Sequence, residues 1–99
     1  MKKKKLTYHG RTLTISAESY MNNGTLALMF TYDDNGETEV VSVNLNSGFQ
    51  SENCCFLDTN HAPDNEKWIR THNIGIPLNI SCRSGFCLYP LYQINTAAL

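Results

Sequence analysis

The Asp-Asn-Gly-Glu segment at residues 34–37 constrains the fold of this chain more than any other feature of its sequence. It separates two strand-like runs at residues 25–32 and 38–45. Asn-Gly tolerates the positive φ angles of a type I′ turn, so Asn35 and Gly36 are expected to be the two loop residues of a β-hairpin. The sequence therefore predicts a fold built on antiparallel strands.

This loop implies a register that places apolar residues opposite one another on a single face of the hairpin. The expected pairs are Phe30 with Val41, Leu28 with Val43 and Leu26 with Leu45. The other face is mixed, as expected of an antiparallel sheet that is covered on one side only.

The only expected helix covers residues 63–73. Pro63 is suited to its first turn, and Asn73 can end it in the left-handed conformation. Trp68 and Ile69 are the side chains expected to pack this helix against the sheet.

Short strands are expected on both sides of these elements. His9-Gly10 predicts a tight turn near the start of the chain, and residues 86–94 alternate like a last strand. Pro90 cannot donate to a ladder, so this strand is expected at a sheet edge or beside a bulge. Residues 46–62 are expected to be irregular. The combined prediction is an α+β fold, an antiparallel sheet of about five strands with one helix packed on one face.

The basic residues are concentrated at the start of the chain. Four of the eight stand at residues 2–5, whereas residues 6–99 carry nine acidic residues and four basic ones. Residues 1–5 are expected to be a disordered basic terminus, with a tether to nucleic acid or membrane as the alternative, and residues 6–99 a single domain. The acidic body disfavours direct nucleic-acid binding and favours a protein partner with a basic surface. The sequence does not indicate an oligomeric state.

No stretch of the sequence resembles a membrane span or a secretory signal, so we expect no membrane association and a cytoplasmic location. In that reducing compartment the four cysteines would be thiols or metal ligands instead of a disulfide framework.

A zinc site is the alternative use of the thiols. Its ligands would be Cys55, His61, Cys82 and Cys87. The spacing contains no Cys-x-x-Cys, and buried thiols acting as small apolar side chains are the simpler interpretation. We therefore expect no cofactor, with zinc as the alternative.

The sequence offers no convincing catalytic apparatus. Cys55 with His61 or His72 lacks a glycine-rich oxyanion segment, and Asp58 with Asp64 is better explained by turn formation. We therefore expect a protein that is not an enzyme.

Four acidic residues gather at the predicted hairpin tip and form the candidate protein-binding site. They are Asp33, Asp34, Glu37 and Glu39. Such a cluster is either a solvated tip or an acidic knob that contacts a basic partner.

Four segments, taken in order, resemble a known family of small proteins. They are Ser-Val-Asn-Leu at 42–45, Cys-Phe-Leu-Asp-Thr-Asn at 55–60, Asn-Ile-Gly-Ile-Pro at 73–77 and Ser-Gly-Phe-Cys-Leu-Tyr-Pro-Leu-Tyr at 84–92. Over roughly residues 8–94 the chain is similar to the family named domain of unknown function 4313.

This family has no established activity, so the resemblance transfers no catalytic residue. It implies an origin in mobile elements and phages of Gram-positive bacteria, and hence an accessory role. The expected function is a non-enzymatic protein-binding module, in its narrowest form an inhibitor of a host defence nuclease such as a CRISPR effector. The alternative function is a small zinc-binding protein.

Overall fold

The computed structural model describes residues 2–21, 23–45, 48–60 and 64–99. Within these ranges the chain forms two four-stranded antiparallel sheets, one short α-helix and a final 3-10 turn. The first sheet contains β1 (Lys2–Tyr8), β2 (Arg11–Ser19), β3 (Leu26–Tyr32) and β4 (Thr38–Val40), in that order. The second sheet contains β5 (Ser42–Val43), β6 (Cys54–Leu57), β8 (Cys87–Ile94) and β7 (Gly75–Ser84), in that order. The helix α1 covers Asn65–Thr71, and the 3-10 turn η1 covers Thr96–Ala98.

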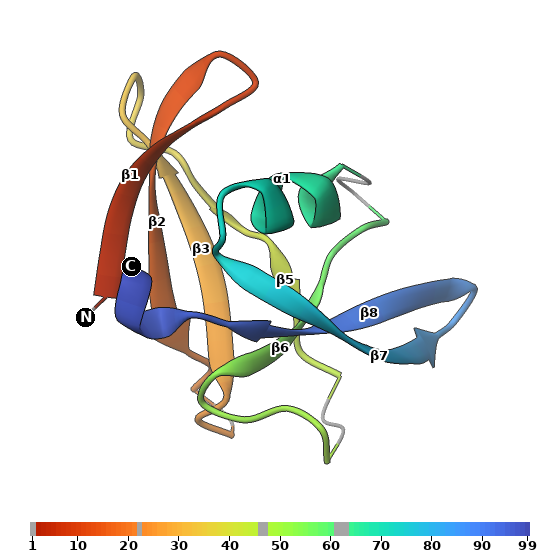
Figure 1. The fold of residues 1–99 in the computed structure, drawn as a ribbon. Helices are drawn as coiled ribbons and strands as arrows, with labels where there is room; N and C mark the ends of the chain where they lie inside the picture. Colours follow the sequence, from red (N-terminus) through yellow and green to blue (C-terminus); the bar gives the residue numbers. More distant parts are fainter. Residues whose placement is uncertain (1, 22, 46–47, 61–63) are drawn as a thin grey trace.

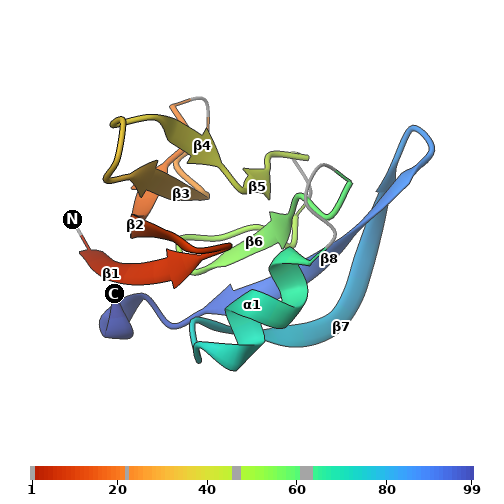
Figure 2. The same ribbon diagram turned by 90° about the horizontal axis from the view of Figure 1, so that it is seen from above.

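The two sheets and the helix share one core. Figure 1 shows α1 beside the base of the β7–β8 hairpin. In both Figure 1 and Figure 2 this hairpin extends away from the rest of the molecule. The residues at the centre of the core are fully buried and come from all three parts. They are Leu13, Ile15 and Leu28 of the first sheet, Cys55 and Leu57 of the second sheet, and Ile69 of the helix. A smaller apolar cluster, with Phe56, Tyr89 and Leu91, covers the other face of the second sheet.

The expected fold class is confirmed in its coarse form, since antiparallel strands are combined with one helix. The expected single sheet of about five strands is wrong. The run at 38–45 breaks at Val41, so that β4 belongs to the first sheet and β5 to the second. A strand that changes sheets in this way forms a corner and lets both sheets pack on one core.

The hairpin at residues 34–37 forms, but with a different register from the expected one. Phe30 pairs with Glu39, and Val41 donates its backbone N–H to the carbonyl of Leu28 at 2.9 Å. The loop is longer than two residues because Gly36, at φ +74°, donates its N–H to the carbonyl of Tyr32 at 2.8 Å. The observed partner of Phe30 on the second strand of this hairpin is therefore two residues away from the expected partner, Val41.

Other turn predictions are confirmed by the backbone. His9 and Gly10 both have positive φ, and Tyr8 pairs with Arg11, so the loop between β1 and β2 contains two residues. Asn73, at φ +56°, follows the end of α1 as expected. Pro63 lies outside the described residues.

Two predictions at the second sheet and the terminus need correction, and a third is confirmed in one of its two forms. Residues 46–62 are not all irregular, because β6 pairs with both β5 and β8. Pro90 lies in an internal strand and not at an edge, but the expected bulge is confirmed, because the register shifts on β7 between Pro77 and Ser81, and Ser81 is the partner of Pro90. Lys2 to Lys5, expected to be disordered, form the first part of β1 and pair with β2. Lysines on an outer strand are a known protection against edge-to-edge pairing.

Candidate functional site

The acidic tip has internal partners for most of its charge. Lys5 Nζ lies 2.8 Å from Asp33, and the Arg11 guanidinium donates to both oxygens of Asp34 at 2.9 and 3.1 Å. The hydrogen bond from Arg11 also holds the pKa of Asp34 below its ordinary value. Since two carboxylates are already paired with cations, the tip presents less negative charge than the sequence suggested.

Glu39 also has a partner in the protein. The Tyr32 hydroxyl donates to its carboxylate at 3.0 Å, and burial together with this carboxylate raises the pKa of Tyr32. The Arg11 guanidinium covers the Tyr32 ring, 3.8 Å from its centroid. Glu37 is exposed at the end of the loop. The four residues do lie together, but three of the four carboxylates already have partners within the protein and stabilise the end of the hairpin.

The proposed zinc ligands are dispersed. Cys55 is fully buried in the central core, whereas Cys82 and Cys87 flank the end of the β7–β8 hairpin in the second apolar cluster. His61 lies outside the described residues. Among the residues that are described, no three His, Cys, Asp or Glu side chains gather as a metal site would require. Burial raises the pKa of the Cys55 thiol to about 12, so this thiol stays protonated.

A second polar cluster joins the β1–β2 turn to the start of α1, and sequence reasoning missed it. The His9 Nε2 and Asp64 Oδ2 atoms lie 2.5 Å apart. The Tyr8 hydroxyl lies 3.1 Å from both Asp64 and the buried Asn65, and burial, followed by Asp64, raises the pKa of Tyr8. Because Asp64 accepts from two side chains, it acts as a structural acceptor that fixes the turn on the helix.

Aromatic rings complete this second cluster. Trp68 donates its indole N–H to the Thr7 carbonyl at 2.9 Å, and its ring lies 5.2 Å from Tyr8 and 4.5 Å from His72. A cavity of about 230 Å³ opens between these rings. The partners come from opposite halves of the chain, so no local motif could have indicated the cluster.

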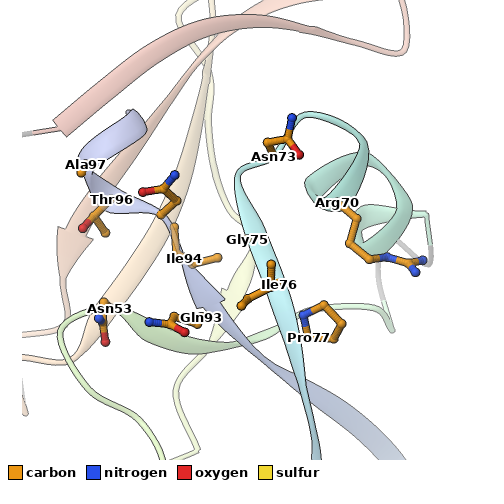
Figure 3. A pocket seen from close by; sticks show the side chains of 11 residues that line it. Asn53, Arg70, Asn73, Gly75, Ile76, Pro77, Gln93, Ile94, Thr96 and Ala97 are labelled. Carbon is orange, nitrogen blue, oxygen red and sulfur yellow. The ribbon is translucent and has the colours of Figure 1, made fainter.

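A larger cavity lies at the other end of α1, beside the start of the outer strand β7 of the second sheet (Figure 3). Its volume is about 640 Å³, within the range of cavities that bind ligands. Four of its lining side chains are carboxamides, from Asn53, Asn73, Gln93 and Asn95. Arg70 is the only charged side chain among the lining residues.

Gly75 allows the strands beside this cavity to pack closely. A Cβ atom at this position would lie 2.8 Å from the Ile94 side chain and 3.0 Å from the Gln93 carbonyl. The cavity wall therefore depends on a glycine whose role is close packing, not an unusual φ. Sequence reasoning missed the whole cavity because its carboxamides are separated by up to forty-two positions, from residue 53 to residue 95.

The β7–β8 hairpin carries three large apolar side chains that are exposed. Ile76 is 59% exposed, Phe86 is fully exposed and Leu88 is 56% exposed. Phe86 is in the two-residue loop, since Ser84 pairs with Cys87 and Gly85 has φ +62°. Within the residues that the structure describes, the outer strand β7 pairs with β8 and with no second strand.

Comparison with known protein families identifies the family of this chain. The chain matches the family described as Domain of unknown function (DUF4313) over residues 12–99. No curated protein and no solved structure matches it. In the described part of the chain, no helix is long and apolar enough to cross a membrane.

Proposed function

The chain belongs to the family described as Domain of unknown function (DUF4313), and on the basis of its surface we propose that it is a non-enzymatic protein-binding module. Its contact element is the β7–β8 hairpin. The observation that carries this proposal is the exposure of Phe86 and Leu88 on an element that extends from the body (Figure 1).

Exposed aromatic side chains of this kind are typical anchors of protein interfaces. Isolated apolar residues are normal on any surface, but Phe86 and Leu88 are close in sequence and lie at the far end of one hairpin. Burying each of them against a partner would contribute about 1.5–3 kcal/mol before the costs of association. Interfaces derive most of their affinity from a few such residues.

The hairpin replaces the acidic tip as the preferred contact surface. Asp33 and Asp34 are neutralised by Lys5 and Arg11, so an incoming basic partner would have to compete with pairs that already exist. For the same reason, the charge of the acidic tip no longer argues that the protein inhibits a defence nuclease by occupying a basic channel. Contact through an apolar hairpin is compatible with inhibition of such a nuclease and with other regulatory roles.

The proposed location is the cytoplasm. All four cysteines are free thiols, which is the state that a reducing compartment maintains. Cys54, Cys82 and Cys87 are only partly buried and would be open to oxidation elsewhere.

A capture experiment with matched variants tests the proposed surface. The tagged chain, the double variant Phe86→Ser/Leu88→Ser and the control Met21→Ser are each incubated with lysate of the source organism. Met21 is fully exposed as well, but it follows β2 and lies outside the hairpin. We expect one protein to be recovered with the unchanged chain and with Met21→Ser, and its affinity for the double variant to fall at least about tenfold. Equal recovery by all three proteins would refute the proposed contact surface.

A further inference from the structure

The large cavity lies on the outer side of the second sheet, at the start of the same hairpin. Gly75, Ile76 and Pro77 of β7 form one wall, and the end of β8 with η1 forms another (Figure 3). As β7 is the last strand of its sheet, its outer side meets no further strand among the described residues. The lining also includes Asn53 beside β6 and the exposed side chain of Gln93 on the internal strand β8, so a segment lying in this cavity would cross the outer face of the sheet and reach its open edge.

The polar lining of the cavity has unused hydrogen-bonding capacity. The side chains of Asn73, Gln93 and Asn95 are exposed and form no hydrogen bond with the residues that the structure describes. Asn53 uses its carboxamide oxygen to accept from Ser51 at 2.9 Å, which leaves its NH₂ group for other partners. A carboxamide offers one acceptor and one donor group, the same pair of groups as a peptide bond.

The charge of the lining is positive and localised at one end. The cavity is lined by no carboxylate, and Arg70 stands beyond Pro77, away from Gln93 and Asn53 (Figure 3). Arg70 Nε donates to the Glu66 carbonyl at 3.3 Å, but the Glu66 carboxylate instead accepts from Tyr92 at 2.8 Å. The guanidinium of Arg70 forms no ion pair in the described part of the chain, so it can receive a ligand carboxylate.

The edge itself favours contact through side chains. Pro77 has no N–H group, so an incoming strand cannot form a complete ladder with β7 at this position. The bulge after Pro77 interrupts the edge again. Ile76, more than half exposed, adds an apolar contact in the cavity.

We propose that this cavity binds an extended, acidic peptide segment of a protein partner. The carboxamides of Asn73, Gln93 and Asn95 would hold the peptide backbone, and Arg70 would receive one carboxylate. This inference rests on the proposed protein-binding function and adds to it a recognition mode for the partner. A backbone-directed site of this kind tolerates different side chains while keeping the direction and charge of the segment.

Two blocked peptides test this proposal directly on the full ¹⁵N-labelled chain. The probes are acetyl-Val-Ala-Val-Ala-Glu-amide and the same peptide with Lys in place of Glu, titrated by NMR. We expect the side-chain NH₂ signals of Gln93 and Asn95 and the Gly75 amide signal to shift. The Glu peptide should bind about threefold more tightly than the Lys peptide, the size of effect expected for a solvent-exposed ion pair.

Matched variants separate the roles of the lining residues. Arg70→Gln should remove the preference for the Glu peptide, whereas Lys67→Gln, which changes an exposed cation of the same helix outside this cavity, should keep it. Asn95→Ala should weaken both peptides about fivefold. Asn60→Ala, an exposed carboxamide outside this cavity, should have no effect.

Three results would overturn the proposal. The first is the lack of shifts at the cavity with either peptide, and the second is equal affinity for the Glu and Lys peptides. The third is binding of N-acetylglutamate as tight as that of the pentapeptide, which would indicate a small-molecule site. The proposed function can fail or succeed separately from this inference. If capture of the partner depends on Phe86 but not on Asn95, the protein-binding function is supported and the role of the cavity is refuted.

Discussion

Replacement of Gly75 by alanine should destabilise the protein through steric conflict alone. The new methyl group would lie 2.8 Å from Ile94 Cδ1, 3.0 Å from the Gln93 carbonyl and 3.2 Å from Ile69 Cγ2. Ile94 Cδ1 ends its side chain, but Ile69 and Ile94 are both buried and have little space into which to move. The Gln93 carbonyl belongs to the backbone of an internal strand and cannot rotate away.

The expected magnitude follows from two opposing effects. Overpacking of a well-packed core costs about 1–3 kcal/mol. A Gly→Ala change also restricts the unfolded chain, which stabilises the folded state by about 0.4–1 kcal/mol where the backbone conformation permits alanine. The net result for Gly75→Ala should be a loss of about 1–2 kcal/mol, equivalent to a fall in Tm of about 5–10 °C for a domain of this size.

Urea unfolding, followed by the fluorescence of the single tryptophan, measures this loss. Gly48→Ala is the matched control, because nothing lies within 4 Å of a Cβ atom there and its φ is not positive. That variant should be neutral or slightly more stable. If Gly75→Ala and Gly48→Ala unfold at the same urea concentration, the cavity wall does not depend on close packing at Gly75.

Three further predictions concern buried polar groups. Tyr8→Phe removes the hydroxyl group from which Asn65 Oδ1 accepts a hydrogen bond at 3.1 Å. Because Asn65 is buried, we expect the free energy of unfolding, measured in urea, to fall by about 1–3 kcal/mol. An unchanged urea midpoint would contradict this role of the hydroxyl. Burial and then the hydrogen bond to Glu66 raise the pKa of Tyr92 from 10.0 to about 12, so its contribution is complete below pH 10 and is lost as the pH rises toward 12. Tyr92→Phe should therefore flatten the decline of unfolding free energy over that interval, and an identical decline in both proteins would argue against it. Cys55 should resist a thiol reagent until denaturant is added, as followed by mass spectrometry, and rapid labelling of the native protein would show that this thiol is not in the core.

Local turn chemistry was predictable from the sequence because it depends on a few adjacent residues. His9-Gly10 adopts positive φ at both positions, and Asn73 follows the end of the helix in the left-handed conformation. Trp68 and Ile69 pack that helix on the core, as expected of the two large apolar side chains in the segment. These features follow from backbone preferences and periodicity alone.

The register of the central hairpin shows the limit of that reasoning. The observed pairing differs from the expected one by two residues, and such a shift keeps Leu28, Phe30 and Val41 on the same face. The apolar pattern therefore cannot distinguish the two registers. The longer loop is selected by local hydrogen bonds, including that from the Glu37 N–H to the Asn35 side chain at 2.9 Å.

The sequence by itself determined where the chain turns, which side chains are apolar and that the strands are antiparallel. Only the tertiary structure decided that the run at 38–45 divides between two sheets, that Lys2 to Lys5 join β1 and that distant carboxamides surround one cavity. The physical reason is that alternation specifies the face of a strand but not its neighbour. The neighbour is chosen by packing across the whole core, where residues far apart in sequence, such as Leu13, Cys55 and Ile69, meet.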